Sequence, residues 1–521
     1  GSTQEHWVAE ALHGNLKAVA FCPNKLVSKH IVKGKCALFD LYLRENESAR
    51  NFFQPLMGSH GKSVLSKTAF LKDLLKYANP IYVGEVQTDR FDEAVNAMIQ
   101  LLHKIGFGEC SYITEAQAII QSLNLNAATG TLYSGKKKDF FKDFTDEAYE
   151  EIVRESCKRL FLGDMGLWNG SLKAELRPME KVLANKTRTF TAAPIETLLG
   201  GKVCVDDFNN QFYDLHIVGP WTVGMTKFYK GWDRLLKELP DGWIYCDADG
   251  SQFDSSLSPY LINAVTLIRL HFMEHWDVGE IMLKNLYTEI VYTPIAAPDG
   301  TVVKKFKGNN SGQPSTVVDN SLMVCVTMLY ALNCAGVDLT RYQEFLKFFV
   351  NGDDLMIAVQ PNMEHLLDGL QASFKELGLN YEFTSRTKNK SELWFMSHQG
   401  LFRDGVYIPK LEVERIVSIL EWDRSSEPEH RLEAICASMI EAWGHDELLY
   451  QIRLFYAWVL EMEPYKSLAA CGKAPYISEL ALKKLYLDEN FQQRELELYL
   501  QYRTERYLAE PMDEEVEVHH Q

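Results

Sequence analysis

The chain of 521 residues is long enough for three to five average domains or for one large enzyme with several lobes, which excludes a small disulfide-stapled module. Its 54 basic and 71 acidic residues give a net charge of −17, which argues against a protein that binds nucleic acid over its whole surface. The ten cysteines include no C-x-x-C pair, and neither a secretory signal nor an uninterrupted apolar stretch of membrane-spanning length is apparent. We therefore expect a soluble, intracellular protein with free thiols.

The N-terminal two-fifths of the chain combines short amphipathic helices with loops that contain glycine and lysine. The spacing of apolar residues predicts helices over 89–104 and 146–162. Between Gly170 and residue 188 the presence of Pro178 favours an extended loop, and five cations recur there: Lys173, Arg177, Lys181, Lys186 and Arg188. Such a loop could bind a triphosphate, although a run of cations is more often a solvated face.

Two N-terminal features suggest known sites but have simpler explanations. Gly58-Ser-His-Gly-Lys62 has two residues between its glycines, whereas a phosphate-binding P-loop has four, so the segment predicts a turn. Cys22, His30 and Cys36 could be imagined as zinc ligands, but this spacing is more typical of core and surface residues.

The middle of the chain predicts a strand, a loop and a helix in that order. Residues 243–248 form a short apolar strand, and Asp249 and Asp254 follow it. Ser258-Pro259 then supplies an N-cap and a first-position proline for a helix that extends to about residue 275. The first candidate carboxylates therefore lie just beyond a strand end.

A flexible loop over 308–312 leads into an apolar helix over about 316–335, which Gly336 ends. Thr316 and Asn320 are four residues apart, so we expect them on one face of this helix. A hydroxyl and an amide near Asp254 could sense a ribose 2′-hydroxyl, while the simpler interpretation is a helix with a buried polar face.

Two apolar runs over 348–350 and 355–359 flank Asn351-Gly352-Asp353-Asp354, which predicts a hairpin with adjacent carboxylates at its tip. Adjacent carboxylates repel each other and need a cation or water to remain ionised together. Carboxylates on neighbouring strands can share divalent cations, so Asp249 and Asp353 are candidate metal ligands. Helices are predicted over about 363–377, 431–443 and 447–461.

These motifs resemble, in order, motifs A, B and C of the viral RNA-dependent RNA polymerases of the picornavirus-like class. The resemblance rests on Asp249-x4-Asp254, on Ser311-Gly312-x3-Thr316-x3-Asn320 and on Gly352-Asp353-Asp354, and the cation spacing is similar to motif F. The wider strings around residues 246–254, 308–316 and 350–354 look like the potyvirus members, the nuclear inclusion protein b family. The last residues, Glu517 to Gln521, resemble junctions that a potyviral protease cuts, which implies a processed C-terminus.

The resemblance implies an α+β right-hand polymerase fold with fingers, a palm made of an antiparallel sheet backed by helices, and a helical thumb. The implied divisions are 1–205 for an N-terminal extension and fingers, 206–283 and 309–408 for the two parts of the palm, 284–308 for a second part of the fingers, 409–508 for the thumb and 509–521 for an acidic tail.

The resemblance also implies roles for individual residues in RNA-templated RNA synthesis. Asp249, Asp353 and Asp354 would hold two Mg²⁺ or Mn²⁺ ions. Ribonucleotide selection would use Asp254, Ser311, Gly312, Thr316 and Asn320, and triphosphate binding would use Lys173, Arg177, Lys181 and Arg188, with Arg188 favoured by spacing. The lysine of motif D, a proton donor to pyrophosphate, would be Lys388 or Lys390, with Lys388 preferred.

The implied partners are an RNA template and primer, ribonucleoside triphosphates, the genome-linked viral protein and the viral protease, with only indirect contact to replication membranes. The implied location is the host cytoplasm at viral replication complexes, and also the host nucleus. A reverse transcriptase-like palm polymerase and a non-catalytic RNA-binding scaffold are the alternative functions.

Overall fold

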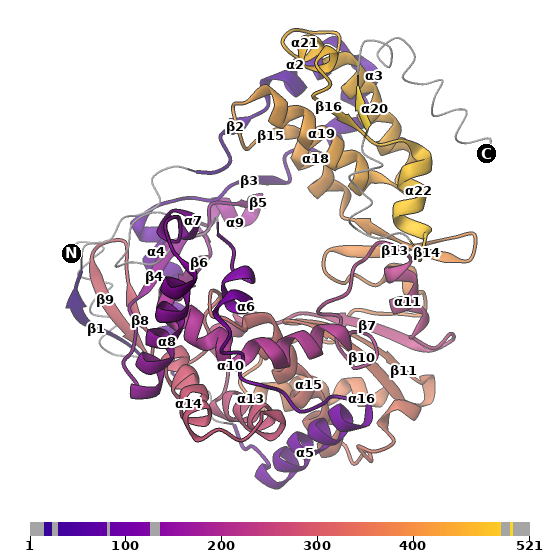
Figure 1. Ribbon diagram of the computed structural model, residues 1–521. Coiled ribbons are helices and arrows are strands. Elements are labelled where there is room, and N and C mark those ends of the chain that lie inside the picture. Colours follow the sequence, from indigo (N-terminus) through magenta and orange to yellow (C-terminus); the bar gives the residue numbers. More distant parts are fainter. Residues whose placement is uncertain (1–14, 23–29, 81–83, 126–135, 491–500, 504–521) are drawn as a thin grey trace.

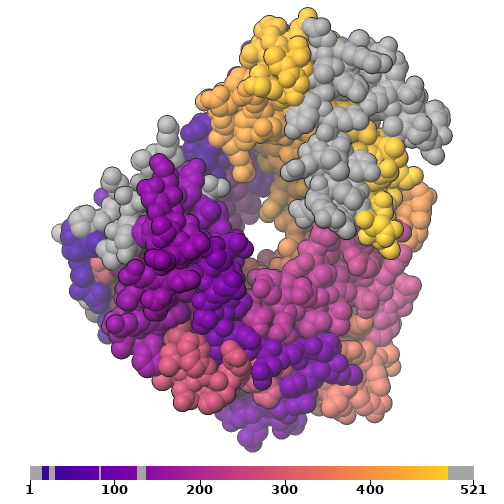
Figure 2. Space-filling model, viewed as in Figure 1, coloured from indigo at the N-terminus to yellow at the C-terminus, as the bar shows by residue number. Residues whose placement is uncertain are grey.

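The computed structural model describes residues 15–22, 30–80, 84–125, 136–490 and 501–503 of the chain. The elements surround a central opening, with the C-terminal helices at the top and the most extensive helical packing at the bottom (Figure 1). Figure 2 shows this opening in the space-filling view, bounded by residues from both halves of the chain. The predicted acidic tail, 509–521, and the protease-like junction lie outside the described residues.

A four-stranded sheet in the order β10-β11-β7-β12 lies at the base of the opening and is antiparallel throughout. Its strands are β7 (Ile244–Ala248), β10 (Leu346–Asn351), β11 (Asp354–Val359) and β12 (Arg386–Thr387). Side chains alternate between two cores: Cys246 and Ile357 face the large helical core, while Tyr245 and Met356 face a smaller core with α11 (Gly231–Lys237). Both faces are buried, which explains why these strands are almost continuously apolar.

Helices from distant parts of the chain cover the first face of this sheet and form the large core. They are α5 (Thr88–Lys104), α8 (Asp146–Leu162), α10 (Ile195–Asp214), α13 (Pro259–Phe272), α14 (Asp277–Val291), α15 (Thr316–Cys334), α16 (His365–Asp368) and α17 (Leu370–Glu376), with short α6 (Ala116–Gln121), α7 (Lys137–Phe140) and α12 (Phe253–Ser256) at the periphery. Helix α15 has the length and hydropathy of a membrane span, but 89% of that stretch is buried inside the protein, as in a core helix.

A second sheet lies on the left of Figure 1 in the order β1-β9-β8-β4-β6. Its strands are β1 (Leu16–Phe21), β4 (Trp168–Leu172), β6 (Thr189–Ala192), β8 (Pro294–Ala296) and β9 (Thr301–Lys305), and α4 (Lys67–Leu74) packs on it through Phe70. A two-stranded ladder of β3 (His60–Lys62) and β5 (Leu176–Pro178), followed by α9 (Met179–Leu183), extends from this region toward the C-terminal helices.

The C-terminal region is a helical bundle that also includes an N-terminal segment. After the hairpin β13 (His398–Arg403) and β14 (Val406–Leu411), the bundle contains α18 (Val413–Glu421), β15 (Trp422–Asp423), α19 (Pro428–Ala442), α20 (Asp446–Val459), α21 (Tyr465–Ala470), β16 (Ala474–Tyr476), α22 (Glu479–Leu487) and β17 (Gln501–Arg503). Helices α2 (Ala37–Glu45) and α3 (Glu47–Phe53) pack into its core, where the Phe39 ring meets Phe53 and Phe455 at 5.1 and 5.0 Å. Strand β2 (Gly34–Lys35) pairs with β15. Residues 34–53 therefore pack against the C-terminal helices and complete the ring around the opening.

Most predicted elements are present within a few residues of their expected bounds. Strand β7, the β10–β11 hairpin and helices α5, α8, α13, α15, α19 and α20 are confirmed. Ser258 caps α13 through the Tyr260 amide at 3.3 Å. The ten cysteines, all among the described residues, form no disulfide.

Three local predictions are wrong. The basic segment is not simply extended, because Pro178 is the N-cap of helix α9, and proline suits a helix start although it breaks a helix interior. The helix predicted over 363–377 is interrupted at Gly369, which ends α16 and precedes α17. The segment predicted only as a turn at Gly58 continues as strand β3.

Candidate active site

Three aspartates meet at one end of the four-stranded sheet. Asp249 directly follows β7, and Asp353 and Asp354 lie at the tip of the β10–β11 hairpin. Because Ala248 is paired with Leu355 in the antiparallel ladder, Asp249 comes next to Asp354 on the adjacent strand. The structure therefore brings together the three carboxylates predicted as metal ligands.

The hairpin tip is held from three sides. Asn351 pairs with Asp354, so Gly352 and Asp353 form a two-residue turn, and the φ of +59° at Gly352 suits the first central position of a type II′ turn. The Gly352 amide donates to the Ser321 hydroxyl of α15 at 2.8 Å, and the Tyr381 hydroxyl donates to the Asp353 carbonyl at 2.6 Å. These contacts fix the backbone that carries both carboxylates.

Burial and mutual repulsion raise the pKa values of the two hairpin carboxylates toward neutral pH. Burial, together with the charges of Asp249 and Asp254, raises the pKa of Asp353 to about 6. Burial and the charges of Asp353 and Asp249 raise the pKa of Asp354 to about 7. A half-buried group of oxygen ligands with unbalanced negative charge suits a hard divalent cation such as Mg²⁺ or Mn²⁺. The residues present therefore fit the predicted metal.

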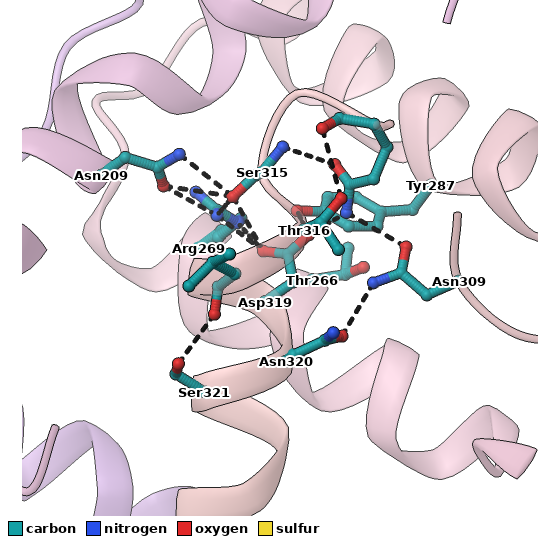
Figure 3. A network of polar contacts seen from close by, with 12 residues as sticks. Asn209, Thr266, Arg269, Tyr287, Asn309, Ser315, Thr316, Asp319, Asn320 and Ser321 are labelled. Atoms are coloured by element: carbon teal, nitrogen blue, oxygen red, sulfur yellow. Dashed lines mark hydrogen bonds and ion pairs between the residues drawn. The ribbon is translucent and has the colours of Figure 1, made fainter. Parts of the chain in front are cut away.

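Asp254 lies beside a network of amide side chains. The Asn320 amide donates to the Asp254 carboxylate at 3.1 Å. The Asn320 carbonyl accepts from the Asn309 amide at 2.9 Å, a bond that Figure 3 shows. The three residues come from the segment after β7, from α15 and from the loop before α15. A carboxylate and two amides thus form one polar group beside the aspartates.

The other polar residues predicted near Asp254 hold the loop itself. The Thr316 hydroxyl donates to the Asn310 carbonyl at 2.8 Å, so of the predicted pair only Asn320 contacts Asp254. The Ser311 hydroxyl accepts from the Thr191 amide at 3.3 Å, and the Gly312 amide donates to the Thr191 carbonyl at 2.9 Å. These contacts attach the loop to strand β6.

A buried ion pair lies behind this loop, and the sequence analysis did not identify it. Arg269 of α13 donates to the Asp319 carboxylate at 2.7 Å, and both side chains are almost fully buried. Asp319 also accepts from the Tyr287 hydroxyl and from the Gln313 amide, both at 2.8 Å (Figure 3). The hint in the sequence is a single Arg in one mostly apolar helix and a single Asp in another.

The predicted phosphate-binding cations line a cavity next to Asp249. The cavity has a volume of about 1030 Å³, and its walls include Arg177, Lys181, Arg188 and Asp249. Four further lysines also line it: Lys186 of the same basic segment, and Lys72, Lys76 and Lys375. The last three come from helical regions far from the basic segment in the chain, so local spacing could not have grouped them with it. The acidic chain therefore has a basic lining at this site.

The cations of the basic segment differ in their surroundings. Arg188 makes two hydrogen bonds to Glu175, at 2.8 and 2.7 Å, and these bonds raise its pKa. Burial, and then the charge of Arg188, lowers the pKa of Lys173. Lys173 is not part of the cavity wall. Its Nζ lies 6.0 Å from the centre of the Phe190 ring. The positive charge of Arg188 acts to lower the pKa of Asp353, against the larger effect of burial, so the basic and acidic parts of the site are within electrostatic reach of each other.

The two candidate motif D lysines lie away from the aspartates. Arg386 and Thr387 pair with Cys246 and Tyr245, so β12 moves away from Asp249 as it approaches Lys388. Lys388 is exposed, and Lys390 is buried with its ammonium 2.9 Å from Asp241, before the start of β7. Neither lysine lines the large cavity, whereas Lys375 does. The proton-donor role of Lys388 stays a prediction.

Comparison with known proteins identifies one family of viral enzymes. A family model described as viral RNA-dependent RNA polymerase matches residues 41–460. The genome polyprotein of Plum pox potyvirus (strain El amar) is 65% identical over 496 residues, which are 95% of this chain and 33% of that polyprotein. The genome polyprotein of Turnip mosaic virus (strain Japanese) is 63% identical over 504 residues, 97% of this chain and 16% of that polyprotein. The chain thus spans a third or less of these relatives.

A solved structure supports the fold. The Sicinivirus 3Dpol RNA dependent RNA polymerase superposes with a TM-score of 0.69 over 86% of this chain and 96% of that one, at 14% sequence identity. At this identity the likeness shows the fold alone. The expected right-hand polymerase fold is confirmed, and so is the resemblance to the potyviral polymerases.

Proposed function

The chain belongs to the viral RNA-dependent RNA polymerases, in the group that includes the potyvirus polyproteins, and from this premise we propose that it extends a primer along an RNA template at the Asp249–Asp353 site. The observation that carries the proposal is the position of Asp249 beside the Asp353-Asp354 turn, next to a cavity lined by Arg177, Lys181 and Arg188. Acidic metal ligands and phosphate-binding cations are the two halves that nucleotidyl transfer requires.

Asp249, Asp353 and Asp354 would hold two Mg²⁺ or Mn²⁺ ions, which supply activation of the primer 3′-hydroxyl and neutralisation of the departing pyrophosphate. The side chains of Arg177, Lys181 and Arg188 would bind and orient the triphosphate. Because these cations are already in position, they need not rearrange when negative charge develops on the leaving group, and they would therefore stabilise the transition state.

The polar group of Asp254, Asn320 and Asn309 would bind the ribose hydroxyls of the incoming nucleotide. A carboxylate accepts a hydrogen bond from a 2′-hydroxyl, and a site built for this hydroxyl disfavours a deoxynucleotide that leaves its polar groups unpaired. This role separates the proposal from a reverse transcriptase-like polymerase. The domain divisions, the genome-linked protein and protease as partners, and replication complexes in the host cytoplasm belong to the same proposal.

The decisive experiment is primer extension with the isosteric variant Asp353→Asn. We expect elongation on a defined RNA primer–template to fall by about three orders of magnitude or more, because one metal ligand loses its charge while the turn keeps its shape. Asp143→Asn, on the exposed surface of the fingers, is the matched control and should elongate normally. Full elongation by Asp353→Asn would point to the scaffold alternative, and a preference for deoxynucleotides in the unmodified chain would point to the reverse transcriptase alternative.

A further inference from the structure

A second cavity lies between the basic segment and the first helix of the C-terminal bundle. Its volume is about 490 Å³, within the range of small-molecule sites. One wall comes from β3, β5 and α9, and the opposite wall comes from β14, α18, β15 and the start of α19. The cavity therefore spans the contact between two regions that are far apart in sequence.

The lining of this second cavity is strongly basic. It contains five arginines and one lysine against a single carboxylate, Glu175; the cations are Arg177, Lys181, Arg188, Arg415, Arg424 and Arg431. Four of them have acidic partners: Arg177 and Arg188 pair with Glu175 at 3.7 and 2.7 Å, Arg415 pairs with Glu412 at 3.4 Å, and Arg431 pairs with Asp423 at 2.6 Å. Within the part of the chain that the structure describes, Lys181 and Arg424 have no recorded ion pair. The cavity thus has more positive charge than its own carboxylates balance.

The excess of positive charge also affects the pKa values of two nearby histidines. Burial, and then the charge of Arg415, lowers the pKa of His60 in the cavity wall. Burial and the charges of Lys62 and Arg424 lower the pKa of the nearby His30. Two buried N–H groups of the lining, the Arg177 Nε and the Trp422 Nε1, have no hydrogen-bond partner among the described residues. Buried donors without acceptors are uncommon, and an anionic ligand would supply the acceptors.

We propose that this second cavity binds a free nucleoside triphosphate, with Arg415 and Arg424 holding its phosphates from the thumb side. Leu411, Ile419 and Trp422 supply an apolar surface for the base, and the limited volume favours one nucleotide over a stretch of nucleic acid. Arg177, Lys181 and Arg188 line both cavities, so a nucleotide here draws on the same cations as the triphosphate at the aspartates. Nucleotide binding at the second cavity therefore ties the basic segment to the thumb.

The test is calorimetric titration of the full chain without RNA, in EDTA, with ATP, inorganic tripolyphosphate and adenosine as separate ligands. We expect Arg415→Gln/Arg424→Gln to weaken ATP binding about tenfold or more, because two charge-assisted phosphate contacts are lost. Arg341→Gln removes an exposed arginine that pairs with Glu344 and does not line the cavity, and should bind ATP as the unmodified chain does. ATP should bind more tightly than tripolyphosphate, because the base adds contacts.

Three results would overturn the proposal. The first is unchanged ATP affinity in the double variant. The second is equal affinity for ATP and tripolyphosphate, which would show that no nucleoside is recognised. The third is weakened binding of a single-stranded RNA decamer with unchanged ATP binding, which would assign the cavity to RNA. If the double variant has a lower thermal midpoint than the unmodified chain, the single variant Arg424→Gln replaces it in the titration. Both arginines are exposed, but Arg415 pairs with Glu412, whereas Arg424 has no ion pair to lose among the described residues.

Discussion

The Asn320 side chain donates a hydrogen bond of 3.1 Å to the Asp254 carboxylate, and this contact joins helix α15 to the segment that follows β7. The carbonyl oxygen of the same side chain accepts a hydrogen bond from the Asn309 amide, so both polar atoms of Asn320 are held and its orientation is fixed. Asp254 is therefore held by a group that can neither ionise nor rotate freely. Under the proposed function, a ribose hydroxyl at Asp254 would meet a preorganised acceptor.

Substitution of Asn320 by leucine should reduce discrimination between ribonucleotides and deoxyribonucleotides by about tenfold or more, because a hydrogen bond to a charged group is lost. The measurement is the ratio of kcat/KM for UTP to that for dUTP in single-nucleotide primer extension. Thr327→Val is the control on the same helix, since the Thr327 hydroxyl donates only to the Met323 carbonyl one turn earlier. An unchanged ratio for Asn320→Leu would remove Asn320 from ribose selection.

Gly312 allows the loop before α15 to approach the backbone of strand β6 closely, and an added methyl group should prevent this approach. A Cβ at this position would come within 2.6 Å of the Thr191 carbonyl oxygen and 2.8 Å of the Ala192 Cα, and both are backbone atoms that cannot turn aside. Gly312→Ala should lower the free energy of unfolding by roughly 1–3 kcal/mol and slow elongation, because the loop before α15 must shift. Gly369→Ala, where no atom lies within 4 Å of the added Cβ, should leave elongation unchanged. Similar activity of both variants would contradict this role.

Removing one partner of the buried Arg269–Asp319 pair should lower the free energy of unfolding more than removing both. Arg269→Met leaves the Asp319 carboxylate buried without its cation, and should lower the free energy of unfolding by about 3–5 kcal/mol. Arg269→Met combined with Asp319→Leu should recover part of this loss, because no isolated charge remains. Urea unfolding followed by intrinsic fluorescence compares the three proteins. A double variant that is no more stable than Arg269→Met would show that the pair is not energetically coupled.

Local sequence patterns predicted the elements of the site well because their physical causes are local. Ser258-Pro259 starts α13 and Gly352 turns the hairpin, and each depends on neighbouring residues alone. The meeting of Asp249 with Asp353 was also predicted, because a strand end and a hairpin tip can lie at the same edge of a sheet, where carboxylates on neighbouring strands can share a cation. The four-residue spacing placed Thr316 and Asn320 on one face but could not show that the Thr316 hydroxyl bonds back to the loop.

What the sequence could not show depends on contacts between distant segments. The packing of Phe39 against Phe455 joins two helices that are far apart in the sequence, and no periodicity within either helix reveals its partner. The same holds for Lys72, Lys76 and Lys375, which reach one cavity from two separate helical regions. Such relationships are set by the tertiary fold, which a single sequence read locally does not specify.

The raised pKa values of the hairpin aspartates predict a pH-dependent penalty in the metal-free protein. Asp353 and Asp354 titrate near 6 and 7 in the folded chain but near 3.8 when unfolded, so the folded state binds more protons between pH 4 and 7. The stability that these two groups contribute is therefore complete below about pH 4 and is lost as the pH rises through 7.

In EDTA, Asp354→Asn should be more stable than the unmodified chain at pH 8, by roughly 1–3 kcal/mol, and nearly equal to it at pH 4. Thermal midpoints at both pH values, with Asp143→Asn as the control, give the comparison, and Mg²⁺ should stabilise the unmodified chain more at pH 8 than at pH 5. A stability difference that does not change with pH would show that charge repulsion at the hairpin tip is not its cause.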